Sequence, residues 1–179
     1  WMPQRDLAMR MSEQTRLRWE RVRENLIGKT EDYPRALILR DTHAENLLWL
    51  PHRGGLARVG LLDFQDAVVG WGEWDMSMLL HDARRDVSPE AREAASRAYL
   101  DGMGVTRAAY DERLAVLGAM NVMRIMGIFA RLVTRDRKPR YDEFQPRLRG
   151  LLNDTLSHPA LAEMRDFVTA VAPHLLVAA

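Results

Sequence analysis

Two short apolar runs, each followed by a carboxylate in a polar loop, constrain this chain more than any other feature. Residues 36–39 read Ala-Leu-Ile-Leu and lead to Asp41, and residues 57–62 are mostly apolar and lead to Asp63. Apolar runs of this length are typical of buried strands, and a loop at the end of a strand is where a rigid scaffold presents reactive groups. Asp41, Asn46 and Asp63 are therefore the candidate site.

A small β element followed by helices is the expected fold. Residues 47–50 form another apolar run, and the turn-rich residues 51–55 would join it to residues 57–62 as a hairpin. After residue 72 the apolar residues follow a helical period. We expect a first helix from Ser12 to Gly28, and later helices over residues 74–86, 89–100, 107–131, 140–156 and 159–171. The predicted fold class is α+β and predominantly helical.

The composition indicates a soluble globular protein. The 179 residues suffice for one compact domain, 47% of them are apolar, and no apolar run approaches the length that spans a bilayer. A net charge of +1 argues against a protein that binds nucleic acid. The sequence has no cysteine and begins without the pattern of a secretory signal. We therefore expect a cytoplasmic protein with neither a membrane nor a nucleic-acid partner.

The segments around the candidate site resemble those of known kinases. Asp41 and Asn46, followed after the hairpin by Asp63-Phe64-Gln65, resemble the H-R-D-x-x-x-x-N and D-F-G segments of protein kinases. The resemblance to the aminoglycoside phosphotransferase family is closer. Within that family, residues 40–51 and 60–67 look most like the sugar kinases that phosphorylate the anomeric hydroxyl of N-acetylmuramate or N-acetylglucosamine.

The resemblance implies a role for each residue of the candidate site. Asp41 would accept the proton of the attacking hydroxyl, while Asn46 and Asp63 would bind Mg²⁺ with ATP as co-substrate. Asp75 lies in a G-x-x-x-x-D segment in which the family's aspartate braces the catalytic loop through its backbone, and Arg40 would support the same loop. The alternative for Asp41 and Asn46 is ordinary turn chemistry, because both residue types bond their own backbone in loops.

Other polar and aromatic residues have two possible roles. His43 and Asp66 are predicted to contact the substrate, but His43 could equally bond within its loop and Asp66 could remain solvated. Trp71 and Trp74 could form a platform for a sugar ring, although packing is the simpler interpretation. Methionines recur every three residues and predict a core rather than a binding surface, and they are Met120, Met123 and Met126.

Two elements of the complete family fold have no counterpart in this sequence. Relatives hold ATP phosphates with a glycine-rich loop and a lysine of an N-terminal lobe, but the 11 glycines here never form G-x-G-x-x-G. We interpret the chain as a single domain, the C-terminal, substrate-binding lobe without the ATP-binding lobe. Residues 1–30 would be the inter-lobe segment and lead-in helix, residues 31–68 the catalytic loop and hairpin, and residues 69–179 the helical subdomain.

The predicted function is that of one lobe of an ATP-dependent small-molecule phosphotransferase acting on an amino-sugar hydroxyl. An isolated lobe should be weakly active or inactive, because nothing covers the phosphates or excludes water. Its expected partners are the sugar, ATP, and either the missing N-terminal lobe or a second copy that pairs through the exposed lobe surface. The alternative is a non-catalytic helical module that binds a sugar or a partner protein.

Overall fold

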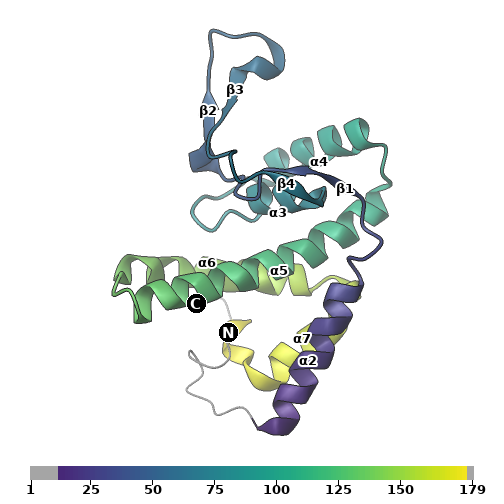
Figure 1. The fold of residues 1–179 in the computed structure, drawn as a ribbon, viewed down its shortest axis with the longest axis vertical. Coiled ribbons are helices and arrows are strands. Elements are labelled where there is room, and N and C mark those ends of the chain that lie inside the picture. Colours follow the sequence, from purple (N-terminus) through teal and green to yellow (C-terminus); the bar gives the residue numbers. More distant parts are fainter. Residues whose placement is uncertain (1–11, 177–179) are drawn as a thin grey trace. The chain divides into compact units, whose positions relative to one another are not determined.

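The computed structural model describes residues 12–176, which form two compact units (Figure 1). We call Tyr33–Leu114 the loop unit, because it contains the candidate site. We call Trp1–Asp32 together with Ala115–Ala179 the helical unit. The predicted similarity of residues 1–3 to an inter-lobe segment lies outside the described residues. The single domain with boundaries near residues 30 and 68 stays a prediction.

The loop unit contains two small antiparallel sheets. Strand β1 (Arg35–Ile38) pairs with β4 (Val68–Trp71), and β2 (Leu47–Trp49) pairs with β3 (Val59–Leu61). In the first sheet Leu37 lies opposite Val69, and in the second Leu48 lies opposite Gly60. The hairpin of β2 and β3 was predicted, and the 3₁₀ helix Gly55–Arg58 precedes its second strand. Strand β4 was not predicted, because it is too short to show an alternating pattern.

The strands are less buried than their apolar sequences predict. Ile38 is buried, but Leu37 is 73% exposed and Val69, its partner across the sheet, is 74% exposed. Leu48 and Trp49 of β2 and Val59 and Leu61 of β3 are also exposed. The prediction of buried strands is therefore wrong for most of these side chains. A two-stranded sheet has two faces and two edges, and the residues of the loop unit cover only part of them.

Two helices complete the loop unit. Helix α3 (Glu73–Leu80) ends well before residue 86, where the sequence pattern placed its end. The reason lies in Asp82, whose Oδ1 accepts a hydrogen bond from the backbone N of Arg84 at 2.8 Å and so replaces helical bonding by a turn. Helix α4 (Pro89–Met103) begins where its sequence predicts and runs three residues beyond the predicted end at residue 100. Ser88 caps the backbone N of Ala91, and Gly104 ends the helix in a left-handed conformation with φ of 64°.

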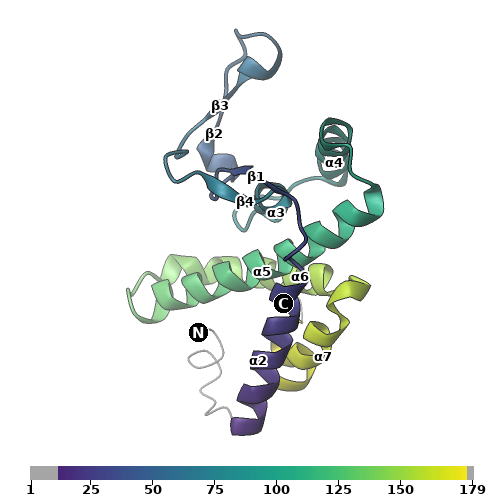
Figure 2. The same ribbon diagram turned by 45° about the vertical axis from the view of Figure 1, so that its right-hand side comes forward.

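The helical unit is built from α2 (Glu13–Gly28), the later part of α5 (Arg107–Thr134), α6 (Gln145–Leu156) and α7 (Ala162–Val171). Helices α2 and α7 lie side by side in both views (Figure 2), and the Nδ2 of Asn25 donates to the Oε2 of Glu163 at 2.8 Å. Short 3₁₀ segments, Pro139–Phe144 and Pro159–Leu161, take up the first residues of the last two predicted helices. The apolar side chains of α6 and α7 form the core of this unit, namely Leu148, Leu152, Leu156, Met164 and Phe167.

Helix α5 is long and apolar enough to cross a membrane by length and composition alone. Long core helices of folded domains pass the same test, and 44% of the most apolar stretch of α5 is buried. Leu117 and Val122 are fully buried and Met126 nearly so. The helix also carries Arg113, Arg124 and Arg131, and placing such charged side chains in the hydrocarbon of a membrane costs free energy. Its apolar character is therefore explained by the core of the protein.

Candidate active site

The loop after β1 begins with a residue in an unusual backbone conformation. Arg40 has a φ of 74°, which is uncommon for a side chain other than glycine. Asp75 of α3 holds this turn, because its Oδ2 accepts from the backbone N of Leu39 at 2.7 Å and its Oδ1 from the backbone N of Arg40 at 3.1 Å. The Nε1 of Trp74 donates to the Arg40 carbonyl at 3.2 Å. Asp75 thus makes the backbone contacts expected of it, and Arg40 takes part through its main chain.

Asp41 presents a half-exposed carboxylate beyond this turn. Its side chain is 53% exposed, and its Oδ2 lies 3.6 Å from the Nε2 of His43. Its backbone carbonyl accepts from the backbone N of His43 at 3.1 Å and from the Nδ2 of Asn46 at 3.0 Å. The main chain of Asp41 therefore ties the loop together, while its carboxylate remains accessible to a substrate hydroxyl.

The orientation of Asn46 follows from its bond to Asp41. Because the Nδ2 faces the carbonyl of Asp41, the amide oxygen Oδ1 must point away from that carbonyl. Among the described residues, the hydrogen-bonding contacts of the Asn46 side chain all involve its Nδ2. An amide oxygen held in this way is a hard ligand of the kind that Mg²⁺ prefers.

His43 is buried within the loop and bonds to its neighbours. It is 6% exposed, and its Nδ1 accepts from the backbone N of Glu45 at 3.3 Å. Its Nε2 lies 3.6 Å from the Oδ2 of Asp41 and 3.4 Å from the Nδ2 of Asn46. These contacts match the interpretation in which His43 bonds locally. A role for His43 in binding the substrate stays a prediction.

Asp82 is a second brace of the loop, and the sequence analysis did not identify it. It is 3% exposed, and its Oδ2 accepts from the backbone N of Ala44 at 3.3 Å. Nearby, the Nε of Arg84 lies 3.4 Å from the Oε2 of Glu45. An aspartate just after an amphipathic helix is a signal for turn chemistry. No local pattern, however, could show that its carboxylate reaches a loop 38 residues away in sequence.

The second acidic loop is joined to the first through the backbone. Asp63 follows β3 with a φ of 55°, and the backbone N of Leu62 donates to the carbonyl of Asn46 at 2.9 Å. The Nε2 of Gln65 donates to the Oδ1 of Asp63. The backbone bond between Leu62 and Asn46 brings the residue before Asp63 next to Asn46, as the predicted hairpin requires. Asp66 lies beyond this turn and is exposed.

The described residues hold no cluster of three or more histidine and acidic side chains suited to a metal ion. A magnesium ion bound together with a nucleotide needs fewer protein ligands, because waters and phosphate oxygens complete its octahedron. Asn46 and Asp63 supply one amide oxygen and one carboxylate from two loops that are bonded to each other. These are the oxygen types that Mg²⁺ prefers, and the role of Asn46 and Asp63 as its ligands stays a prediction.

Buried ionisable groups surround the start and the end of α3. Glu73 is 1% exposed, and its Oε1 accepts from the Nη1 of Arg113 at 3.2 Å. Burial raises the pKa of Tyr33 and of Tyr99 to about 12, with a smaller contribution from the charge of Glu73. These groups anchor the N-terminus of α3, two residues before Asp75.

At the other end of α3, His81 is held in its neutral form. Burial, together with a smaller effect of the positive charge of Arg92, lowers the pKa of His81 from its ordinary value of 6.5 to about 4. A hydrogen bond involving the backbone of Ser77 acts in the opposite direction. His81 directly precedes Asp82, so a change in the charge of His81 would act next to the hydrogen bond between Asp82 and Ala44.

The two tryptophans beside the loop are in contact with each other. The rings of Trp71 and Trp74 lie 6.2 Å apart, tilted by 41°, and the guanidinium of Arg35 lies 5.0 Å from the Trp71 ring. The indole N–H of Trp74 donates a hydrogen bond to the Arg40 carbonyl. Trp74 thus supports the loop through its N–H, and the choice between packing and a sugar platform for the two tryptophans stays a prediction.

The sequence matches known phosphotransferases over most of its length. A family model for the phosphotransferase enzyme family (APH) matches residues 3–112. An N-acetylmuramate/N-acetylglucosamine kinase of Caulobacter vibrioides is 50% identical over 156 residues, which are 87% of this chain and 43% of that protein. A kinase of the same name from Pseudomonas putida is 31% identical over 178 residues, covering 94% of this chain and half of the relative.

A third such kinase, from Neisseria meningitidis, is 29% identical over 161 residues. This chain spans about half the length of the curated relatives it matches. The family match includes both acidic loops and the aspartate that braces them, and the resemblance found in the sequence is thereby confirmed. The chain belongs to the phosphotransferase enzyme family.

Proposed function

We propose that this chain is the C-terminal lobe of an ATP-dependent phosphotransferase whose acceptor is a hydroxyl of an amino sugar of the N-acetylmuramate or N-acetylglucosamine type. The observation that carries the proposal is the braced loop of Asp41, in which an accessible carboxylate and an oriented amide oxygen follow one strand. The names of the relatives support the choice of acceptor. ATP as the donor would place the protein in the cytoplasm.

Each residue of the site has a defined task in this proposal. Asp41 accepts the proton of the sugar hydroxyl as that hydroxyl attacks the terminal phosphate of ATP. The Oδ1 of Asn46 and the carboxylate of Asp63 would hold Mg²⁺, and the bound ion would neutralise charge on the phosphates. His43 keeps its Nε2 beside Asp41 and so orients the carboxylate. Asp66 is available to a sugar hydroxyl because it is exposed.

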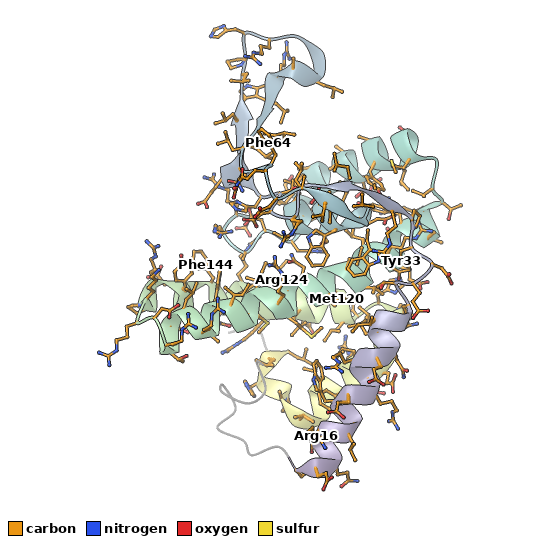
Figure 3. The ribbon with its side chains drawn as sticks, viewed as in Figure 1. Arg16, Tyr33, Phe64, Met120, Arg124 and Phe144 are labelled. Atoms are coloured by element: carbon orange, nitrogen blue, oxygen red, sulfur yellow. The ribbon has the colours of Figure 1, made fainter. Side chains whose placement is uncertain are left out.

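A covering lobe is also part of the proposal. Large apolar side chains are exposed on and around the hairpin, among them Trp49 at 65%, Leu56 at 94% and Phe64 at 59% (Figure 3). Leu37 and Val69 of the other sheet are also exposed, at 73% and 74%, and exposed large apolar side chains of this kind often mark a surface that another protein covers. We propose that an N-terminal ATP-binding lobe covers this surface in a complete enzyme, or that a second copy does so for this chain alone.

The experiment is to put this chain in place of the matched segment of the Caulobacter relative. The hybrid is assayed for ADP release with N-acetylmuramate, N-acetylglucosamine and an aminoglycoside, and the chain alone is assayed beside it. We expect the hybrid to turn over the two amino sugars and the chain alone to be far slower. Asp41→Asn should lower kcat by about 10²–10⁴-fold, because it removes the general base.

Asp101→Asn is the matched control, because it changes an exposed carboxylate of α4 in the same way. It should keep the turnover of the parent hybrid. Unchanged turnover in Asp41→Asn would exclude Asp41 as the base.

A non-catalytic binding module is the second candidate, because the exposed apolar surface would also fit a partner protein. It predicts a hybrid that binds N-acetylglucosamine, as seen by saturation-transfer NMR, yet forms no ADP. The phosphotransferase proposal predicts both binding and ADP release.

A further inference from the structure

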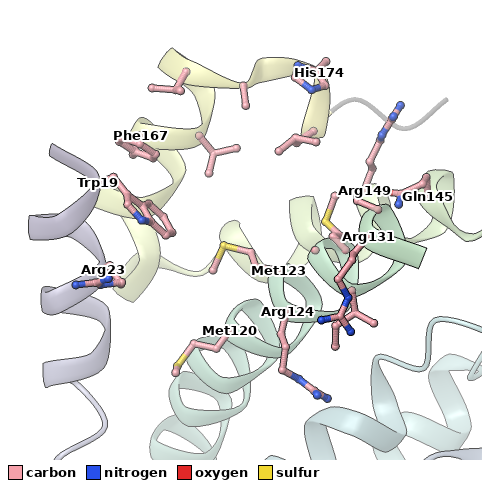
Figure 4. A pocket seen from close by; sticks show the side chains of 18 of the residues that line it. Trp19, Arg23, Met120, Met123, Arg124, Arg131, Gln145, Arg149, Phe167 and His174 are labelled. Atoms are coloured by element: carbon pink, nitrogen blue, oxygen red, sulfur yellow. The ribbon is translucent and has the colours of Figure 1, made fainter. Parts of the chain in front are cut away.

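The helical unit has a partly open hollow of about 700 Å³ whose lining residues all belong to that unit (Figure 4). Side chains of α2, α5, α6 and α7 form its walls. Trp19 and Phe167 lie on one side with ring centres 5.5 Å apart, and Met123 lies between them and Arg149. The volume falls within the range of small-molecule sites, about 300–1,000 Å³.

The walls of the hollow suit an aliphatic chain. Phe167 is 4% exposed and Met126 is 2% exposed, and both contribute apolar surface to the wall of the hollow. Met120 and Met123 are only half-buried, although their spacing predicted a closed core. Unbranched methionine side chains adapt to a flexible ligand, whereas ring-shaped polar ligands need fixed hydrogen-bonding groups.

The charged groups at the hollow are predominantly basic. Among the described residues that line it, Asp142 is the single acid, and the basic groups are Arg23, Arg124, Arg131, Arg149 and His174. The Nε of Arg149 is buried and has no hydrogen-bond acceptor among the described residues. Arg149 extends from α6 toward the side of the hollow where His174 lies (Figure 4). A buried guanidinium donor without an acceptor favours an anion at this end.

We propose that this hollow binds an amphipathic anion, namely a medium-chain aliphatic carboxylate, with its chain along Met123 and Phe167 and its carboxylate on Arg149. The excess of basic groups selects the anion over a neutral or cationic amphiphile of the same length. The site goes beyond the proposed phosphotransfer, because Asp41, Asn46 and Asp63 belong to the other unit and none of them lines it.

Methyl NMR of the full chain tests the location of binding. The chain is labelled with ¹³C at the methionine methyls and titrated with decanoate below its micellar concentration. We expect saturable shifts of Met120, Met123 and Met126, which line the hollow. Met78 and Met103, which do not line it, are the internal references. Absence of saturable shifts, or equal shifts at all methionines, would overturn the proposal.

The charge requirement is tested with decanol and with changes at Arg149. Decanoate should bind at least tenfold more tightly than decanol. Arg149→Met should remove that difference, while Arg149→Lys, which retains the charge, should keep most of it. Arg165→Met is the matched control, because Arg165 lies on α7 and does not line the hollow.

Equal affinity for decanol and decanoate would refute the selection of an anion. So would full decanoate affinity in an Arg149→Met variant that melts at the same temperature as the parent chain. Because these measurements concern binding alone, their outcome is separate from that of the ADP-release assay.

Discussion

Single residues in this protein are held in place by groups that are distant in sequence. Asp75 and Asp82 each use a carboxylate to accept from backbone N–H groups of the loop that contains Asp41 and Asn46. Hydrogen bonds from backbone groups to a charged acceptor are among the stronger ones, about 1.5–3 kcal/mol each. They offset the backbone strain at Arg40, whose φ is 74°.

The neutral state of His81 predicts a loss of stability in mild acid. The folded chain has a His81 pKa of about 4 against 6.5 for an ordinary histidine. Above pH 6.5 both the folded and the unfolded chain hold the neutral ring, so His81 adds no pH dependence there. Between pH 6.5 and 4 the unfolded chain takes up a proton that the folded chain resists, and stability falls. The expected contribution is about 2 kcal/mol between pH 7.5 and pH 5.

Urea unfolding of the parent chain and of His81→Gln at both pH values measures this effect. Carboxylates change stability in the same range, so only the difference between the two proteins is compared. The variant should lose about 2 kcal/mol less on acidification. His52→Gln, which alters an exposed histidine, should follow the parent chain. An identical loss in His81→Gln would show that His81 is not the sensitive group.

At the scale of elements, the sheet of β1 and β4 depends on a close approach. A Cβ added at Gly70 of β4 would overlap the Cδ1 of Ile38 and lie 2.9 Å from its Cγ1. Ile38 is 5% exposed and is the buried side chain of β1. A larger residue at position 70 would therefore have to displace Ile38 or separate the two strands that precede and follow the candidate site.

Gly70→Ala should destabilise the chain by about 1–3 kcal/mol, the usual cost of overpacking. Gly102→Ala is the matched control, since nothing lies within 4 Å of its added Cβ and alanine favours the helix α4. It should leave stability unchanged or raise it. Thermal unfolding of both variants measures the two changes in stability. Adding Ile38→Val to Gly70→Ala should recover part of the lost stability. Equal melting temperatures for the two glycine variants would contradict the close packing.

At the scale of the whole molecule, the exposed strands predict self-association of the chain alone. Leu37 and Val69 face each other across the sheet and are both more than 70% exposed. We expect the sedimentation coefficient of the chain to rise with concentration over roughly the micromolar range, because contiguous apolar surface drives association. Combining Leu37→Thr with Val69→Thr keeps β-favouring residues and should reduce the association.

Leu17→Gln is the control for this test, because Leu17 is 54% exposed on α2 of the helical unit. It should associate as the parent chain does. A parent chain that stays monomeric throughout would show that its apolar strands do not mediate pairing.

The sequence by itself determined the features that arise from neighbouring residues. The caps at Ser12 and Ser88, the end of α4 at Gly104 and the hairpin that separates the two acidic loops all follow local rules. These signals depend on side chains that bond the backbone within a few positions, so they can be read without a fold. The family motif likewise indicated Asp41, Asn46, Asp63 and Asp75 before any geometry was known.

Only the tertiary structure decided which distant groups meet and which surfaces stay open. The hydrogen bond from Ala44 to the carboxylate of Asp82 and the pairing of β4 with β1 join residues 30 or more positions apart. The exposure of the strands depends on which other elements cover them. The hollow beside Met123, with its basic and apolar lining, likewise exists only because several helices meet there. Such features arise from packing between elements, and the pattern of a single segment carries no information about its partner.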